Sequence, residues 1–330
     1  MTAYANFQAA FLGELQLIVE DGANIEVRGN LTREVCAHTI EIEDVLNRYI
    51  VLSHRNNNVF ASIAEAMWLL AGRSDLPYIE AYLPRATDYS DDGKTWRGGY
   101  GPRLRNWNGI DQLAEVLSIL TKNLSSRRAV AVLYDPDRDF VESKDIPCNN
   151  WLHFLARSGR LDLYVAARSV DIWWGFSGAN VFEWSLLLEL MAFWLNQRPG
   201  HLVFFTSSLH LYQRHFEAAE RLLADAAKAQ LKRSLLPAPR FATDWQDFAS
   251  ELAEWMRLEE GIRHGSKLDE LTSALTDPLL ITYVHMIDLF WRFKRHEKLG
   301  DLEELLADEG DTRLREAALE FFRRPRGKSR

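Results

Sequence analysis

Asp145-Ile146-Pro147-Cys148-Asn149-Asn150 stands near the start of residues 126–215, the region from which the architecture of the chain is most readily inferred. A second polar group, Arg168-Ser169-Val170-Asp171, begins twenty residues after the cysteine, and Ser208-Leu209-His210-Leu211-Tyr212 closes the region. Strongly apolar segments separate the three groups. Binding and reactive side chains commonly lie in loops and at element ends that a rigid core positions, so we expect this region to carry the chemistry.

The composition is that of an ordinary soluble globular protein. The 330 residues are 47% hydrophobic and 26% charged, and the formal net charge at pH 7 is −8. This length predicts one large domain, with or without an appendage. The negative charge argues against a protein that coats nucleic acid, which needs a broad basic face. A few arginines in a pocket would still suffice for a phosphorylated small molecule.

Targeting and metal signals are absent from the sequence. The two cysteines, Cys36 and Cys148, form no CxxC pair, so no zinc ribbon and no metal site are expected. The N-terminus has no basic segment followed by an apolar one, and no apolar run is long enough to cross a bilayer. We therefore expect a reduced, cytoplasmic protein without membrane association.

Hydrophobic periodicity predicts a mixed α/β chain. Apolar residues at helical spacing predict helices at residues 7–20, 59–70, 110–120, 181–195 and 215–229. Apolar runs and alternation predict strands at residues 33–42, 129–134, 161–167 and 201–206. We expect the strand at 129–134 and the helix at 181–195 to be buried, because they are apolar on most sides. Residues 84–101, rich in Gly, Asp, Ser and Tyr, predict a long functional loop.

The C-terminal part of the chain differs in character. After Leu235-Leu236-Pro237-Ala238-Pro239 the sequence becomes charged and helical, and it ends in a basic run from Arg323 to Arg330. These features divide the chain into residues 1–239, which hold the polar groups quoted above, and a helical C-terminal extension at residues 240–330. A charged terminal run is usually a solvated tail, so nucleic-acid binding is the less favoured interpretation.

Cys148 is a candidate nucleophile. It follows a proline and precedes two asparagines, at the expected start of an element where backbone N–H groups lower the pKa of a thiol. A lone cysteine is otherwise usually a small buried hydrophobe, so both interpretations stay open. Glu65 poses a similar choice. A carboxylate in the apolar helix 59–70 either lies at the edge of the apolar stripe or transfers protons with a raised pKa.

Arginines at strand ends suggest an anion site. Arg127 and Arg128 precede the strand at 129–134, and Arg168 follows the strand at 161–167. Guanidinium groups bind phosphate through two parallel hydrogen bonds. Surface ion pairing is the common alternative for any one of these arginines.

In combination, these residues resemble the thymidylate synthase superfamily over residues 33–216. The motifs that carry the resemblance are specific through their order and spacing, although each is weak alone. They are Glu65-x-x-Trp68-Leu69-Leu70-x-Gly72, Tyr100-Gly101-x-x-x-Arg105-x-Trp107, Ser126-Arg127-Arg128, Pro147-Cys148, Arg168-Ser169-x-Asp171-x-x-x-Gly175 and His210-x-Tyr212.

The resemblance implies a one-carbon transfer from 5,10-methylenetetrahydrofolate to C5 of a pyrimidine nucleoside 5′-monophosphate. Cys148 would attack C6 of the pyrimidine as a thiolate, which makes C5 nucleophilic. Glu65 would order water and move protons, and Tyr100 would assist removal of the C5 proton. A non-catalytic nucleotide- or RNA-binding relative is an alternative, but it would tolerate loss of Cys148.

The resemblance also implies the residues that bind each substrate, and with them an obligate homodimer. Arg168 and Ser169 would hold the 5′-phosphate, while Arg127 and Arg128 would reach the phosphate in the site of the partner subunit. The remaining assignments are His210 and Tyr212 to the sugar 3′-hydroxyl, Asn180 to the base edge, Arg33 to the nucleotide, and Asp171 and Gly175 to the folate. The implied fold is α/β (α+β): a mixed, mostly antiparallel sheet with helices on one face and the dimer interface on the other.

Departures from the orthodox enzyme favour one branch of this superfamily. Asn149 stands where His usually follows the nucleophile, Ala167 where Gln precedes Arg-Ser, and the segment from Gly175 to Asn180 is one residue longer. A helical extension replaces the apolar C-terminal tail, and Ala86 stands where a tryptophan packs beside the folate. These differences are similar to the branch that makes 5-hydroxymethylpyrimidine nucleotides, in which water traps the exocyclic methylene. We therefore expect hydroxymethylation, with Asn149 placing the water and thymidylate synthesis as the alternative.

Base and sugar specificity stay open in the sequence. An amide at Asn180 suits uracil, which offers O4 as an acceptor and N3–H as a donor. The additional residue leaves Ala179 as the alternative at the base edge, and Glu183 would suit cytosine if the backbone is shifted. Ser169 with the paired arginines resembles the deoxynucleotide-specific members, and a ribonucleotide enzyme is the alternative.

Overall fold

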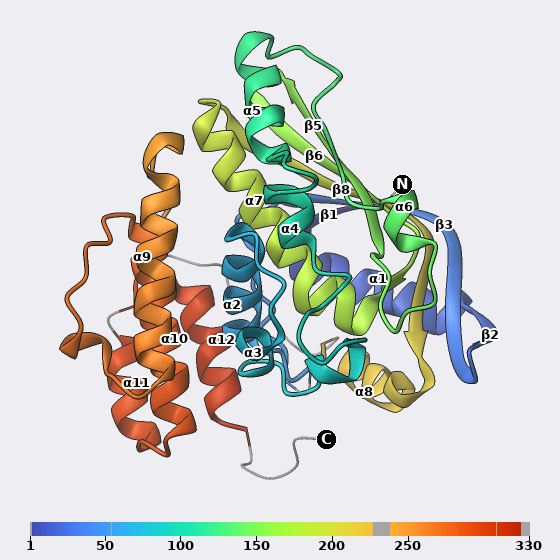
Figure 1. Ribbon diagram of the computed structural model, residues 1–330. Coiled ribbons are helices and arrows are strands. Elements are labelled where there is room, and N and C mark those ends of the chain that lie inside the picture. The colour runs from blue at the N-terminus through green and yellow to red at the C-terminus, as the bar shows by residue number, and fades with distance from the viewer. Residues whose placement is uncertain (1, 54, 227–237, 308, 325–330) are drawn as a thin grey trace.

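The structure, a computed structural model, describes residues 2–53, 55–226, 238–307 and 309–324 (Figure 1). The strands are β1 (Thr2–Asn6), β2 (Ala23–Val27), β3 (Asn30–Asp44), β4 (Val130–Val132), β5 (Asn149–Arg157), β6 (Arg160–Ala167), β7 (Val170–Asp171) and β8 (Arg198–Tyr212). The α-helices are α1 (Phe7–Asp21), α2 (Val59–Leu70), α3 (Leu76–Glu80), α4 (Tyr100–Arg105), α5 (Gln112–Lys122), α6 (Pro136–Asp139), α7 (Val181–Trp194), α8 (Phe216–Ala226), α9 (Trp245–Arg263), α10 (Pro278–Lys294), α11 (Leu299–Ala307) and α12 (Thr312–Phe322). Short helical segments are η1 (Ala86–Tyr89), η2 (Ile172–Asn180), η3 (Gln213–His215) and η4 (Leu268–Glu270).

The strands form one mixed sheet in the order β1-β3-β8-β6-β5-β4, with β2 also paired to β3 and β7 to β8. The β3–β8, β5–β6, β4–β5 and β2–β3 pairs are antiparallel, and β1–β3, β6–β8 and β7–β8 are parallel. The longest register runs from Thr32 opposite Tyr212 to Ile42 opposite Leu202. A mixed, mostly antiparallel sheet is therefore confirmed.

Helices cover one face of the sheet. The helix α7 packs on β6 and β8, and α1 packs on β3 (Figure 1). Leu161, Leu163 and Val165 of β6 point into this layer and are fully buried, as their alternation predicts. Nearly all of α7 is buried because α2 covers its other side, which confirms the expected core helix at residues 181–195.

The opposite face of the sheet carries exposed apolar side chains that no helix of the described residues covers. In β4, Val130 and Val132 are 39% and 52% exposed, so the expectation that this strand is buried throughout was wrong. Only alternate residues of an edge strand can face the core. On the same face, the ring of Phe205 lies 6.4 Å from that of Trp151 and stacks at 6.1 Å on Tyr164. We call this aromatic and aliphatic surface the open face.

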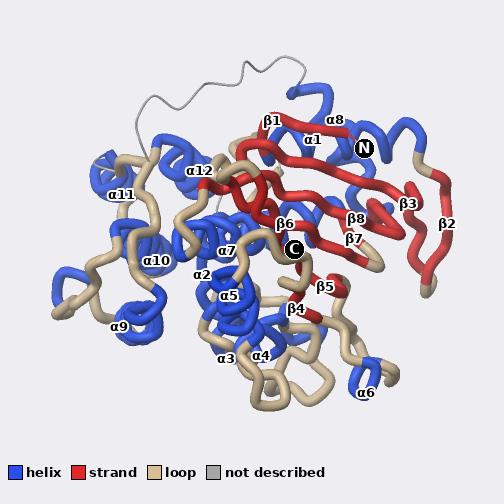
Figure 2. Tube along the Cα trace, turned by 90° about the horizontal axis from the view of Figure 1, so that it is seen from above, coloured by secondary structure: helices blue, strands red, loops and turns tan. Residues whose placement is uncertain are grey.

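The C-terminal helices lie on the side of α2 that faces away from the sheet (Figure 2). Phe60 of α2 contacts Phe290 of α10 at 5.5 Å and Phe322 of α12 at 5.1 Å between ring centroids. These side chains belong to the same hydrophobic core as the sheet. The division of the chain near residue 239 stays a prediction, and residues 227–237 and the end of the basic tail, 325–330, lie outside the described residues.

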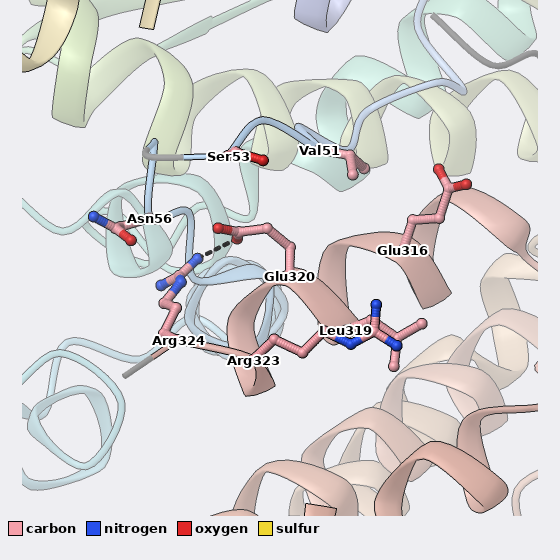
Figure 3. A pocket seen from close by; sticks show the side chains of 8 residues that line it. All are labelled: Val51, Ser53, Asn56, Glu316, Leu319, Glu320, Arg323 and Arg324. Carbon is pink, nitrogen blue, oxygen red and sulfur yellow. Dashed lines mark hydrogen bonds and ion pairs between the residues drawn. The ribbon is translucent and has the colours of Figure 1, made fainter. Parts of the chain in front are cut away.

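A pocket of about 450 Å³ opens between the segment after β3 and the end of α12 (Figure 3). Both of its arginines are paired with carboxylates: Arg324 with Glu320, and Arg323 with Glu303 at 2.9 Å. The pocket contains none of the residues nominated above for catalysis or binding. Its balanced charges also give no net attraction for an anion.

Candidate active site

Cys148 lies directly before β5 on a loop that Arg168 holds in place. The backbone N–H of Arg168 donates to the carbonyl oxygen of Cys148 at 2.9 Å. Its side chain donates from Nε to the carbonyl oxygen of Pro147 at 3.0 Å and from NH2 to that of Ile146 at 2.7 Å. One arginine therefore fixes three consecutive residues that end at the thiol.

The thiol is partly buried and lies in a field of mixed sign. Burial raises the pKa of Cys148 above its ordinary value, while the guanidinium of Arg168 lowers it and the carboxylates of Asp145 and Asp171 raise it. Arg168 is thus the neighbour that favours the nucleophilic thiolate.

A chain of hydrogen bonds begins at Asn149, the residue after Cys148. Asn149 donates to Tyr100 Oη from its backbone N–H at 3.1 Å and from Nδ2 at 2.5 Å. Nδ2 also donates to Asn180 Oδ1 at 3.3 Å, and Asn180 Nδ2 donates to Glu183 Oε2 at 3.3 Å. The side chain of Asn149 is fully buried, and its Oδ1 has no partner among the described residues. Three parts of the sequence that are distant from one another meet in this hydrogen-bond chain: α4, β5 and the junction of η2 with α7.

Carboxyl groups with little exposure to water lie near this hydrogen-bond chain: Glu183 is buried, and Glu65 and Asp145 are partly buried. Burial raises the pKa of Glu65 well above its ordinary value, and the negative charges of Glu183 and Asp145 add to the effect. Burial raises the pKa of Glu183 to about 7, although the hydrogen bond from Asn180 opposes this. Glu65 therefore favours its protonated form more than an exposed carboxyl group does, which suits a group that transfers protons.

The long loop at residues 84–101 packs on the segment before the nucleophile. Trp96 donates from its indole nitrogen to the carboxylate of Asp145 and stacks on Tyr89 at 6.1 Å. The backbone approaches so closely at Gly98 that a Cβ there would lie 2.0 Å from Asp145 Oδ2. Ala86 is buried in η1. Neither the role of Asp145 nor that of Trp96 was predicted, because a loop has no periodicity that reveals which segment it contacts.

His210, Tyr212 and Asp171 meet at the end of β8. The rings of His210 and Tyr212 are 5.2 Å apart and nearly perpendicular. Asp171 lies opposite His210 in the β7–β8 register, and its Oδ1 accepts the backbone N–H groups of Trp173 at 2.9 Å and Trp174 at 3.3 Å. Asp171 Oδ2 takes no hydrogen bond from the described residues. This free acceptor, beside the half-exposed ring of Trp174, fits a flat ligand ring with N–H donors.

Ser169 and Gly175 lie in the same part of the chain. Ser169 is half-buried between Arg168 and β7, and Gly175 belongs to η2, a π-helix that the periodicity did not predict. A π-helix holds more residues per hydrogen-bonded turn than an α-helix, which accommodates the additional residue before Asn180. A Cβ built on Gly175 would lie 3.7 Å from Asn180 Oδ1, so the glycine borders this amide.

The structure does not bring Arg127 and Arg128 to the thiol of their own chain. Val130 pairs with His153, five residues beyond Cys148 along the sheet. A strand rises about 3.3 Å per residue, so the two arginines lie roughly 16 Å or more from the nucleophile.

Arg33 also lies apart from this group. It pairs with Leu211, one residue from His210, and successive side chains of a strand alternate between faces. Arg33 therefore points to the face opposite His210. There it donates to the carbonyl oxygen of Val19 at 3.4 Å and covers the ring of Phe216 at 4.4 Å.

Within the described parts of the chain, no group of three or more His, Cys, Asp or Glu side chains is arranged to hold a metal ion. No helix among the described residues has the length and apolarity needed to cross a bilayer.

A mixed sheet with helices on one face, and an arginine-held cysteine before β5, define a thymidylate synthase-like protein. The comparison with known families agrees. The chain belongs to the thymidylate synthase family, whose profile, described as "Thymidylate synthase", matches residues 9–255. The resemblance inferred from the motifs is therefore confirmed.

Three relatives show where this chain falls among known proteins. It is 37% identical over 214 residues to the "Deoxyuridylate hydroxymethyltransferase" of Bacillus phage SP01, covering 61% of this chain and 56% of that protein. It is 28% identical over 289 residues to the protein of the same name from Delftia phage PhiW-14, covering 81% and 80%. A "Putative thymidylate synthase" of Methanothermobacter thermautotrophicus is 31% identical over 211 residues, covering 63% and 91%. The chain thus spans little more than half the length of the SP01 relative.

Proposed function

We propose that this chain transfers a one-carbon unit from 5,10-methylenetetrahydrofolate to C5 of a pyrimidine nucleoside 5′-monophosphate and releases the 5-hydroxymethyl nucleotide. The observation that carries the proposal is the convergence of Cys148, Arg168 and Tyr100, which belong to separate elements. The names of the SP01 and PhiW-14 relatives support a hydroxymethyl product and deoxyuridylate as the substrate. dCMP and CMP are the alternative substrates.

Cys148 acts as the nucleophile. Its sulfur forms a bond to C6, the electrons of the C5–C6 double bond move toward O4, and C5 then bonds to the methylene carbon of the second substrate. Arg168 binds the 5′-phosphate together with Ser169. Because the same guanidinium holds the carbonyl groups of Ile146 and Pro147, phosphate binding and thiol placement depend on one side chain.

Tyr100 and Glu65 transfer protons, and Asn149 binds the attacking water. Tyr100 Oη accepts two hydrogen bonds from Asn149, which stabilise negative charge on this oxygen while the C5 proton is removed. Departure of tetrahydrofolate leaves an exocyclic methylene on the pyrimidine. Water adds to this carbon, the thiolate leaves C6, and the double bond reforms. The buried, unpaired Oδ1 of Asn149 suits a water molecule that donates to it.

A second copy of the chain completes the site. The open face presents Trp151 and the 40%-exposed Phe205, an apolar surface of the kind that interfaces bury. Arg127 and Arg128 line a separate pocket of about 510 Å³ with Lys122. Since these arginines cannot reach the thiol of their own chain, the homodimer places them at the phosphate of the partner's site.

Mixing two inactive variants tests the dimer. The C148A variant lacks the nucleophile, and an R127A/R128A variant lacks the crossing arginines. A heterodimer would contain one complete site, so an equimolar refolded mixture should regain about one quarter of wild-type activity. No recovery in a mixture shown to contain heterodimers would remove the crossing arginines from the proposal.

Tritium release from nucleotides labelled at C5 tests the chemistry. We expect release from dUMP by the wild type, none by C148A, and undiminished release by C36A, because Cys36 is an exposed thiol on β3. No release from dUMP, dCMP, UMP or CMP would overturn the proposal. Product analysis then distinguishes the two outcomes: a 5-methyl product with dihydrofolate would establish thymidylate synthesis instead of hydroxymethylation.

A further inference from the structure

Donors and acceptors alternate in a fixed order along the hydrogen-bond chain from Glu183 to Tyr100, and Glu183 determines this order. An ionised carboxylate only accepts hydrogen bonds, so Asn180 must turn its NH2 group toward Glu183. The carbonyl oxygen of the Asn180 amide then faces Asn149, which must offer its own NH2 group. Tyr100 Oη finally receives donors from Asn149. Reversing any one amide would place two donors or two acceptors against each other.

This order also determines what Asn180 presents to a ligand. One N–H and one lone pair of its amide are engaged by Glu183 and Asn149, so one N–H and one lone pair remain, in fixed positions. In the orientation observed, the remaining donor suits O4 of uracil and the remaining acceptor suits its N3–H. Turned by 180°, the same amide would suit the N4 amino group and N3 of cytosine.

We propose that Glu183 is a positioning residue that makes the site select uracil over cytosine, by fixing the amide orientation of Asn180. The inference rests on the proposed function and on the assignment of Asn180 to the base edge that the family resemblance implies. Glu183 itself need not touch the nucleotide. It lies in the first turn of α7, directly behind Asn180, and it is 4% exposed.

Glu183 acts only as a hydrogen-bond acceptor when it is ionised, and the groups around it influence the pH at which it ionises. Glu65 approaches it from α2, and Asp145 acts on Glu65 from the loop before the nucleophile. Tyr100 of α4 closes the other end of the chain. Burial raises the pKa of Glu183 to about 7, so Glu183 is a charged acceptor at pH 8.5.

The test compares dUMP with dCMP as substrates at pH 8.5, using tritium release by the full-length protein. The wild type should prefer dUMP. In E183Q the side chain can either accept from or donate to Asn180, so both amide orientations become accessible. The ratio of kcat/KM for dUMP to that for dCMP should therefore fall by about tenfold or more. E183D retracts the acceptor from Asn180 and should lower the same ratio, which keeps the test decisive if E183Q does not fold.

A matched control separates this effect from loss of a buried carboxylate in general. Glu251 is a buried carboxylate in α9 that accepts hydrogen bonds from Thr276 and takes no part in the hydrogen-bond chain from Glu183 to Tyr100. E251Q should leave the dUMP-to-dCMP ratio unchanged. A folded E183Q with an unaltered ratio, or a wild type that prefers dCMP, would overturn the inference alone. Absence of turnover on every nucleotide would instead overturn the proposed function.

Discussion

Replacing Arg103 by methionine should destabilise the protein severely and reduce catalysis with it. Arg103 lies on α4, the helix that carries Tyr100, and is 2% exposed. Its guanidinium donates to both carboxylate oxygens of Asp139, at 2.7 and 2.8 Å, and to the carbonyl oxygen of Leu133 at 2.6 Å. It therefore joins α4 to α6 and to the end of β4.

The expected magnitude follows from the burial of both partners. Asp139 is 3% exposed, so R103M leaves a carboxylate away from water without its cation. Breaking a buried pair from one side costs about 3–5 kcal/mol, a large share of a total stability of about 5–15 kcal/mol. Burial alone would raise the pKa of Asp139, but the hydrogen bonds from Arg103 hold it below its ordinary value. The stability from the Arg103–Asp139 pair is complete above the unfolded pKa of Asp139 and is lost as the pH falls through the lower folded pKa. The difference in unfolding free energy between wild type and R103M should therefore narrow in acid.

Urea unfolding at pH 7 and at pH 3, followed by tryptophan fluorescence, measures both quantities. R85M is the control, because Arg85 and Asp88 form an ion pair with both side chains more than half exposed, and no measurable loss is expected there. A loss below about 1 kcal/mol for R103M at pH 7 would show that the pair is not the structural link described here. A loss that does not depend on pH would show that the effect is one of packing rather than charge.

Three further predictions concern the site and the dimer. Burial raises the folded pKa of Glu183 to about 7, above an unfolded value of about 4.3. The stability that Glu183 gives the folded protein is therefore complete below about pH 4.3 and is lost as the pH rises through 7, so E183Q should gain stability relative to wild type between pH 5 and pH 8. Urea melts measure this, and a difference that stays constant with pH would contradict it. F205D should shift the sedimentation coefficient from dimer to monomer. L305D should not, because Leu305 is 48% exposed on α11, one of the C-terminal helices on the side of α2 away from the sheet. R168M should slow alkylation of Cys148 by iodoacetamide at pH 7.5, because the guanidinium favours the thiolate; an equal rate would remove Arg168 from that role.

The periodicity of apolar residues predicted helices and strands correctly where a single segment packs on a continuous hydrophobic core. Helix 59–70 agrees in both bounds with α2, and Asn58 caps it by accepting the N–H of Ala61 at 3.1 Å. The strand expected at 201–206 is part of the longer β8, which continues through His210 and Tyr212. Polar residues at the end of β8 interrupted the apolar pattern, although the backbone ladder with β3 continues beneath them.

Some residues of the candidate site could likewise be predicted from the sequence, and others could not. Cys148, Arg168 and Tyr100 could be nominated from residue type, order and resemblance. The structure shows Arg168 donating to the Ile146–Cys148 segment, and Tyr100 accepting from Asn149, the residue after Cys148. Arg33 could not be assigned to a face, because the face of a strand residue depends on its register with a neighbouring strand.

The periodicity of the sequence was sufficient for the mixed α/β class, and the order and spacing of its motifs were sufficient for the family. The role of Cys148 as the nucleophile stays a prediction from that resemblance. Three features required the folded arrangement: the pKa of Glu65, the direction of the hydrogen bonds that end at Tyr100, and the separation of Arg127 from its own thiol. Each of these depends on distances between elements far apart in sequence and on the exclusion of water between them. No periodicity within a single segment encodes such distances.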